Sequence, residues 1–206
     1  MFRPAWRSVR ARCQSRRMPV SLRRPDHVKS VMRRGKHMIS PDYVRLMTAY
    51  NAEMNRRLYA AAANLTDAER KADRGAFWSS IHGTLVHLYW GDYQWMSRFD
   101  GWQKPDVPIK QSAGMIEDFD DLRTRRVKAD ADLDAWAGRI GRAWLADDLV
   151  WFSGAAGREM RRPKSKLLVH FFNHQTHHRG QVHAMLTACG QQTGDTDLFL
   201  VVPDPD

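Results

Sequence analysis

The chain has 206 residues, of which 43% are apolar, and it contains eight tryptophans. This length and composition are typical of one globular domain with a buried core, and they exclude a chain that is disordered throughout. No apolar run approaches the ~20 residues of a membrane-spanning helix, so we expect no membrane segment. The two cysteines, Cys13 and Cys189, have no CxxC partner. We therefore expect no disulfide framework and a reducing, cytoplasmic location.

The net charge of +10 belongs to the start of the chain. Twelve of the 33 basic residues, but only one of the 23 acidic residues, lie in residues 1–37. The rest of the chain has 21 basic and 22 acidic residues. The body therefore lacks the basic bias that binding to a phosphate backbone requires, and we expect no nucleic-acid partner for it.

Residues 1–37 have three competing interpretations. They could form a basic arm that binds nucleic acid or anionic lipid, or an arginine-rich transit peptide. They could also result from a misassigned start, with Met38 as the true one. We favour the misassigned start, because a well-formed helix start follows Met38 at once. We expect residues 1–37 to be a disordered extension and residues 38–206 to form the single domain.

Four segments have the apolar periodicity of amphipathic helices. The first, about 41–64, begins with Ser40 as N-cap and Pro41 at the first helical position. The others span about 77–99, about 115–139 and about 163–188. The sequence "LVWFSGAAGREMRR" before the last helix predicts a short hairpin or an extended loop. The pattern predicts an all-α fold, a four-helix bundle, with the apolar "LFLVV" of the tail packed against it.

The last predicted helix is rich in histidine. Because residues i and i+4 share a helix face, His170, His174 and His178 form one stripe. Any adjacent pair in the stripe could place two imidazole nitrogens about 2.0–2.1 Å from one divalent metal ion. The i,i+3 pair of His174 and His177 is also conceivable, and the spacing does not choose among these pairs. A cluster held by hydrogen bonds without a metal is the alternative.

A metal site needs a further ligand from another helix. The second predicted helix offers His82 and His87. The last helix lacks the HExxH pattern of metalloproteases, because Gln175 follows His174. Gly180, in the middle of this helix, indicates the close approach of a neighbouring helix, and a glycine without a packing role is the alternative.

Two motifs resemble the DinB family. "NHQTHHRGQVHAML" is similar to the N-H-x-x-x-H-R-G-Q pattern on the last bundle helix of that family. "SIHGTLVHLYWGDYQW" resembles the second helix, with His87, Asp92 and Trp95 at the positions that the family pattern gives them. The resemblance extends in order over about residues 38–200, and the basic start is a departure from it.

The resemblance implies a four-helix bundle with one divalent metal ion held by three histidines. Carried over by position, these are His87, His174 and His178. His82, His177 and His183 fall on positions that are not ligands. His170 and His177 are the candidates for hydrogen-bonding to a ligand. Three imidazoles suit zinc or nickel first, and also iron, copper or manganese.

Three functions are compatible with such a site. Relatives in the wider superfamily include metal-dependent transferases and isomerases that use a low-molecular-weight thiol, so the first hypothesis is transfer of a small thiol to an electrophilic small-molecule substrate. The second is metal-dependent hydrolysis. Asp92 lies about 140° round the helix from His87, so His177 would be the acid–base candidate. The third is a non-enzymatic, damage-inducible metal-binding bundle. The resemblance also implies a homodimer.

Overall fold

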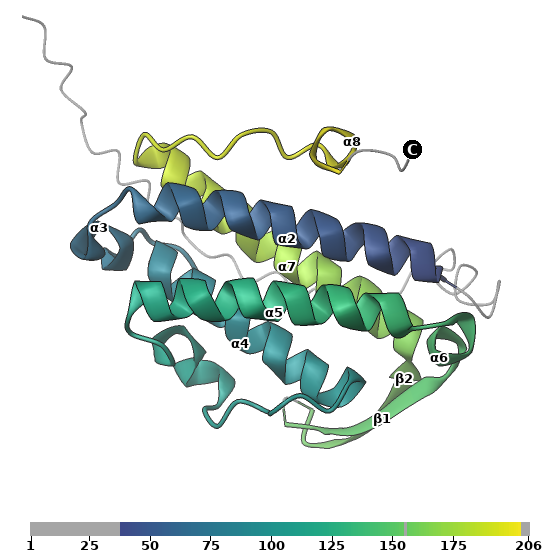
Figure 1. The fold of residues 1–206 in the computed structure, drawn as a ribbon. Coiled ribbons are helices and arrows are strands. Elements are labelled where there is room, and N and C mark those ends of the chain that lie inside the picture. Colours follow the sequence, from purple (N-terminus) through teal and green to yellow (C-terminus); the bar gives the residue numbers. More distant parts are fainter. Residues whose placement is uncertain (1–37, 155, 203–206) are drawn as a thin grey trace, which may run out of the picture. The chain divides into compact units, whose positions relative to one another are not determined.

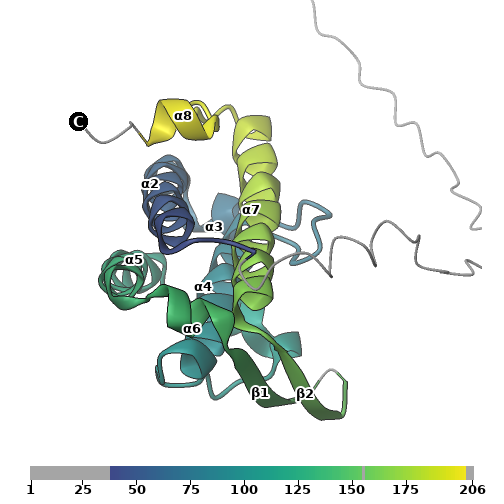
Figure 2. The same ribbon diagram turned by 90° about the vertical axis from the view of Figure 1, so that its right-hand side faces the viewer.

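The computed structural model describes residues 38–154 and 156–202, so the interpretation of residues 1–37 lies outside the described residues. Four long helices dominate, as the sequence predicts. They lie in two layers, with α2 and α5 side by side in one layer and α4 and α7 in the other (Figures 1 and 2). Their bounds are α2 Pro41–Ala63, α4 Ile81–Phe99, α5 Phe119–Arg139 and α7 Lys164–Ala188.

The first helix, α2, begins as predicted. The side chain of Ser40 accepts a hydrogen bond from the backbone N–H of Tyr43, and Pro41 occupies the first turn. The short helix α3 (Asp67–Lys71) follows. Its capping box joins Thr66 and Glu69, and each side chain bonds the backbone N–H of the other residue.

Helix α4 begins at Ile81, four residues later than the sequence predicts. The hydroxyl of Ser80 accepts a hydrogen bond from Gly83 N–H (3.0 Å) and caps the helix there. The preceding residues form a tight turn in which Ser79 has a φ of 62°. A residue in the left-handed conformation cannot continue a right-handed helix. The apolar pattern that begins at about residue 77 therefore predicted the start of the helix too early.

The third long helix also begins later than predicted. Asp118 caps α5 by accepting a hydrogen bond from Asp121 N–H (2.7 Å). The segment before it contains the 3₁₀ helix η1 (Ile109–Gly114), which packs against α4. A short helix, α6 (Arg142–Ala146), follows α5.

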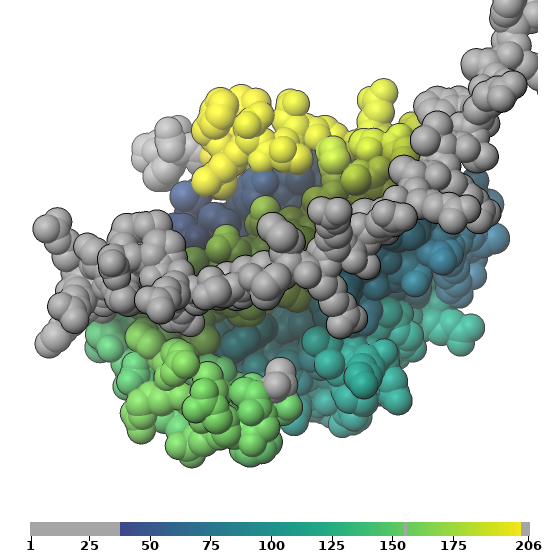
Figure 3. Space-filling model, turned by 180° about the vertical axis from the view of Figure 1, so that it is seen from behind, coloured from purple at the N-terminus to yellow at the C-terminus, as the bar shows by residue number. Residues whose placement is uncertain are grey.

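The predicted hairpin is present between α6 and α7. Strands β1 (Asp148–Ser153) and β2 (Arg158–Pro163) pair antiparallel, with Trp151 opposite Met160. They lie at one end of the bundle (Figure 1) and project below the helices (Figure 2), and in the space-filling view from behind they form a green lobe at the lower edge (Figure 3). Helix α7 then runs to Ala188, and Gly190 follows its end with a φ of 76°, a left-handed conformation that glycine adopts readily after a helix.

The prediction for the tail is only partly correct. Helix α8 (Leu198–Val201) lies beside α2 and buries Val201. Phe199 and Leu200, however, are 77% and 57% exposed. A single helical turn can place only one of its sides on the bundle, so the rest of the apolar run faces outwards.

The apolar core has two parts. One part contains Leu58, Leu85, Phe119 and Leu186. The other part lies in the opposite halves of the same four helices and includes Val44, Met96, Phe99, Trp136, Phe171 and Phe172. Each long helix therefore contributes to both parts.

A polar layer separates the two apolar parts. The buried Arg126 on α5 forms ion pairs with Asp92 on α4 and Asp130 on the same helix. Asn55 on α2 donates a hydrogen bond to Asp130 (3.0 Å), and Gln175 on α7 donates one to Asp92 (2.6 Å). We call these five residues the polar layer. It connects all four long helices in the middle of the bundle.

None of the helices in the described part of the chain is long and apolar enough to span a membrane. The cytoplasmic location and the homodimer stay predictions.

Candidate metal centre

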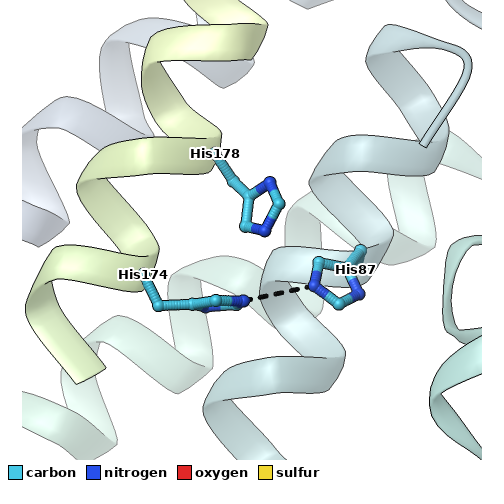
Figure 4. A group of neighbouring side chains, drawn as sticks. All are labelled: His87, His174 and His178. Atoms are coloured by element: carbon cyan, nitrogen blue, oxygen red, sulfur yellow. Dashed lines mark hydrogen bonds between the residues drawn. The ribbon is translucent and has the colours of Figure 1, made fainter. Parts of the chain in front are cut away.

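Three histidines from two helices meet on the α4–α7 interface. His87 lies on α4, and His174 and His178 lie one turn apart on α7. Their side chains point toward one another (Figure 4), and one nitrogen from each lies within 4.8 Å of the other two. The structure thus brings together the three residues that the family resemblance implies.

Gly91 lies against the ring of His174. A Cβ at this position would lie 3.1 Å from Cε1 of His174, a tight contact that would require the imidazole to shift by a few tenths of an ångström. Glycine therefore leaves the imidazole room against α4 without such a shift. The close approach of a neighbouring helix that the sequence indicated at Gly180 is wrong, because nothing lies within 4 Å of a Cβ built there.

The proton of His87 is held away from the centre. The single hydroxyl proton of Ser112 goes to the backbone carbonyl of Ile109 (2.7 Å), so Ser112 Oγ must accept from His87 Nδ1 (2.8 Å). His87 therefore carries its proton on Nδ1. The lone pair of Nε2 points toward the other two histidines.

His178 is oriented in the same way by Gln181. The side-chain carbonyl oxygen of Gln181 accepts from His178 Nδ1 (2.7 Å), and its amide nitrogen donates to Nε2 of His177 (3.3 Å). The lone pair on His178 Nε2 is again free. His177 therefore helps to orient His178 through Gln181 and forms no hydrogen bond with Nε2 of His178 itself.

The histidines of the centre are neutral at physiological pH. Burial, followed by repulsion from His174 and His178, lowers the pKa of His87 to about 3. Burial and the neighbouring histidines lower the pKa of His174 to about 4, and burial also lowers the pKa of His178. Neutral imidazole is the form that binds a metal ion.

The spacing of the nitrogens also fits a metal ion. Nε2 of His87 and Nε2 of His174 are 3.3 Å apart. Two nitrogens that each lie about 2.0–2.1 Å from one tetrahedral ion are separated by about 3.3 Å. This pair could therefore hold an ion with little movement, and a nitrogen of His178 lies within 4.8 Å of both. Three protein ligands would leave one tetrahedral position for a small molecule.

Two tryptophans make the surroundings apolar. The rings of Trp78 and Trp90 stack with His87, at centroid distances of 4.0 and 5.8 Å. Trp90 Nε1 donates to the carbonyl of Val107 (2.9 Å), which fixes that ring. Gly83 lets the turn that carries Trp78 lie against α4, because a Cβ there would lie 2.7 Å from the Trp78 carbonyl oxygen.

The remaining histidines lie outside the centre. His170 is exposed, and its ring centroid is 6.1 Å from that of His174. His170 therefore continues the histidine stripe along α7, but it does not hold His174 or His178 in position. His82 Nε2 donates to the buried carbonyl of Ile116 (2.8 Å), and His183 Nδ1 bonds Thr193 (2.6 Å). Asp92 is held in the polar layer, so it is not aimed at the centre.

Three residues that orient or accommodate the histidines were among those that the sequence did not reveal. Ser112 lies in a loop 25 residues from His87, and no periodicity links the two. Gly91 lies four residues after His87 and so shares its helix face, which was a signal for the close approach. Gln181 belongs to the N-H-x-x-x-H-R-G-Q pattern and lies three residues after His178, within reach on the same face.

Comparison with known proteins agrees with these features. The sequence pattern of the DinB family matches residues 38–202. The chain is also similar to the protein DinB of Bacillus subtilis (strain 168). The two are 24% identical over 166 residues, which cover 77% of this chain and 93% of that protein. The family match covers all four long helices and the three histidines, and the chain therefore belongs to the DinB family.

Proposed function

We propose that this protein binds one divalent metal ion through Nε2 of His87, His174 and His178, and that it transfers a low-molecular-weight thiol to an electrophilic substrate. The observation that carries the metal site is the hydrogen bonding behind the ligands. Ser112 and Gln181 each hold an Nδ1 proton outwards, so two lone pairs face a third imidazole. Zinc and nickel are the ions we expect first.

The donor set suits thiol chemistry. A divalent ion held by three neutral imidazoles keeps its full charge and would lower the pKa of a coordinated thiol, which makes the sulfur nucleophilic at neutral pH. The residues of the chain then have to exclude water and orient the reactants. Trp78 and Trp90 provide the apolar walls for this.

The absence of a carboxylate beside the three histidines in the described part of the chain favours thiol transfer over hydrolysis. A metal ion would lower the pKa of a bound water as it would that of a thiol, but hydrolysis of an ester or amide also requires a group that delivers a proton to the leaving group. Among residues 38–154 and 156–202, no carboxylate is hydrogen-bonded to the three histidines, and Asp92 is occupied by Arg126 and Gln175. Nε2 of His177, the other acid–base candidate, is bonded to Gln181. A thiolate that adds to an electrophile forms its new bond without such a group. Transfer is therefore the activity that this arrangement supports best.

The metal site is tested first. The metal-free protein is titrated with zinc and with nickel, and bound metal is measured by elemental analysis after gel filtration. We expect one ion per chain, and its loss in His87→Ala, His174→Ala and His178→Ala. His183→Ala is the matched control, since His183 lies on the same helix but bonds Thr193. A wild-type protein that retains neither ion would overturn the proposal.

The activity is tested next on the metal-loaded protein. Electrophilic substrates are screened with glutathione, mycothiol and bacillithiol, and the conjugates are measured by mass spectrometry. Turnover that requires both the thiol and the metal supports transfer. Turnover of esters or amides without a thiol would instead establish a hydrolase. Metal binding with no turnover in either screen would support a non-enzymatic role.

A further inference from the structure

An arginine lies on the same face of α4 as the metal centre. Arg98 follows His87 by eleven residues, which brings it back to within about 20° of the same direction round the helix. Its guanidinium carbon is 4.8 Å from the ring centroid of Trp95 and 5.9 Å from that of Trp151 on β1. Two aromatic rings thus hold the half-buried guanidinium.

This guanidinium has no anionic partner in the described part of the chain. Burial is the only influence that shifts the pKa of Arg98, and it lowers it. The nearby acidic residues are already paired: Asp100 with Arg139 (2.9 Å) and Asp147 with Lys164 (2.8 Å). A guanidinium has five N–H donors in a planar fork that matches a carboxylate.

The hairpin adds positive charge on the same side. Arg158 and Arg162 are opposite Ser153 and Leu149 in the register, so they share the face of the hairpin that carries Trp151. The two acidic residues of the strands, Asp148 and Glu159, lie on the other face. The face beside Arg98 is therefore suited to an anion.

A continuous row of rings connects Arg98 with the metal centre. The ring of Trp95 is 5.3 Å from that of His170, which is 6.1 Å from that of His174. Trp95 follows Gly91, the residue against His174, by four residues, or about 6 Å of helix rise. With the lengths of the side chains, the guanidinium lies on the order of 10 Å from the centre.

We propose that Arg98 binds a carboxylate of the thiol whose sulfur reaches the three-histidine centre. This inference rests on the proposed function and deepens it, because it makes the thiol an anionic one. The contact is a two-pronged hydrogen bond between guanidinium and carboxylate, and the tryptophans position the guanidinium for it. Glutathione and bacillithiol carry carboxylates and mycothiol carries none, so the first two are the favoured class.

The test uses two thiols of equal length, 6-mercaptohexanoate and 6-mercaptohexan-1-ol, because their span suits the distance. Each is titrated into the cobalt(II)-loaded protein, and binding is followed by the thiolate-to-cobalt absorption band. We expect the acid to bind at least tenfold more tightly than the alcohol. In Arg98→Met, which keeps the apolar stem, the acid should bind only as well as the alcohol. In Arg98→Lys, which keeps the charge without the fork, the preference should be intermediate.

The control is Arg123→Met, which removes the same charge at an exposed position on α5 and should leave the preference unchanged. Equal binding of acid and alcohol by the wild type would overturn the carboxylate subsite and leave the thiol proposal standing. A preference that survives in both Arg98 variants would overturn the assignment to Arg98. If neither thiol produces the absorption band, the proposed function itself fails.

Discussion

Replacing Ser112 by alanine tests the geometry behind the metal centre. The hydroxyl is fully buried and accepts the Nδ1 proton of His87 at 2.8 Å. His87 is only 1% exposed, so without this acceptor its Nδ1–H donor would be buried and unpartnered. The ring can then move its proton to Nε2, which removes the lone pair from the centre. Outer hydrogen bonds of this kind contribute about 10–100-fold to metal affinity, or about 1.4–2.7 kcal/mol.

The affinity is measured at pH 7.5 by competition with a chromophoric zinc chelator. Ser165→Ala is the matched control, because it makes the same change at a buried serine of α7 that lies about two and a half turns from His174. We expect a weaker zinc affinity in Ser112→Ala and an unchanged one in Ser165→Ala. A folded Ser112→Ala variant with wild-type affinity would refute the role of Ser112 in setting the tautomer.

Three further predictions concern packing, pH and the polar layer. Gly91→Ala places a methyl group 3.1 Å from the ring of His174, so zinc affinity measured by chelator competition should fall while helix content by circular dichroism is retained; equal affinity would show that the ring can shift freely. The folded-state pKa values of about 3 for His87 and about 4 for His174 lie below the usual 6.5, so unfolding takes up protons below pH 6.5 and the metal-free protein should lose stability as the pH falls from 7 toward 5. Urea unfolding in the presence of a chelator measures this slope, which should be smaller in a double variant with asparagine at both positions. Arg126→Met leaves Asp92 buried without its cation and should cost about 3–5 kcal/mol in the same assay, and a loss below 1 kcal/mol would contradict the importance of this ion pair.

The bundle could be predicted because its helices have strong apolar periodicity and clear start signals. Ser40 and Pro41 mark the first helix in the sequence as they do in the structure. The start of α4 was misplaced because the apolar residues Phe77 and Trp78 continue the pattern through a turn. The left-handed Ser79 and the extended Ser80 interrupt the helix. Serine is a favoured N-cap, but the apolar pattern that continues across both serines hid this start signal.

The candidate site was predictable in part. The i,i+4 rule reduced the histidines of α7 to a stripe, but choosing His174 and His178 over His170 required the family resemblance. The structure shows why spacing alone was insufficient, since His170 lies beside Trp95 and away from His87. Contacts between distant segments, such as that of Ser112 with His87, depend on tertiary packing and leave no local pattern.

The polar layer has a consequence for how this scaffold can change. Sliding α4 or α5 by a turn would separate Arg126 from Asp92 and leave buried charges without a partner. Sliding α2 or α7 would remove the hydrogen bond of Asn55 or Gln175 to a buried carboxylate, so the polar layer fixes the alignment of the bundle. The apolar parts on either side carry no such constraint, and side chains of similar volume can replace one another there at small cost. A bundle of this kind can drift far in sequence, in its core as well as on its surface, while its histidines stay in place.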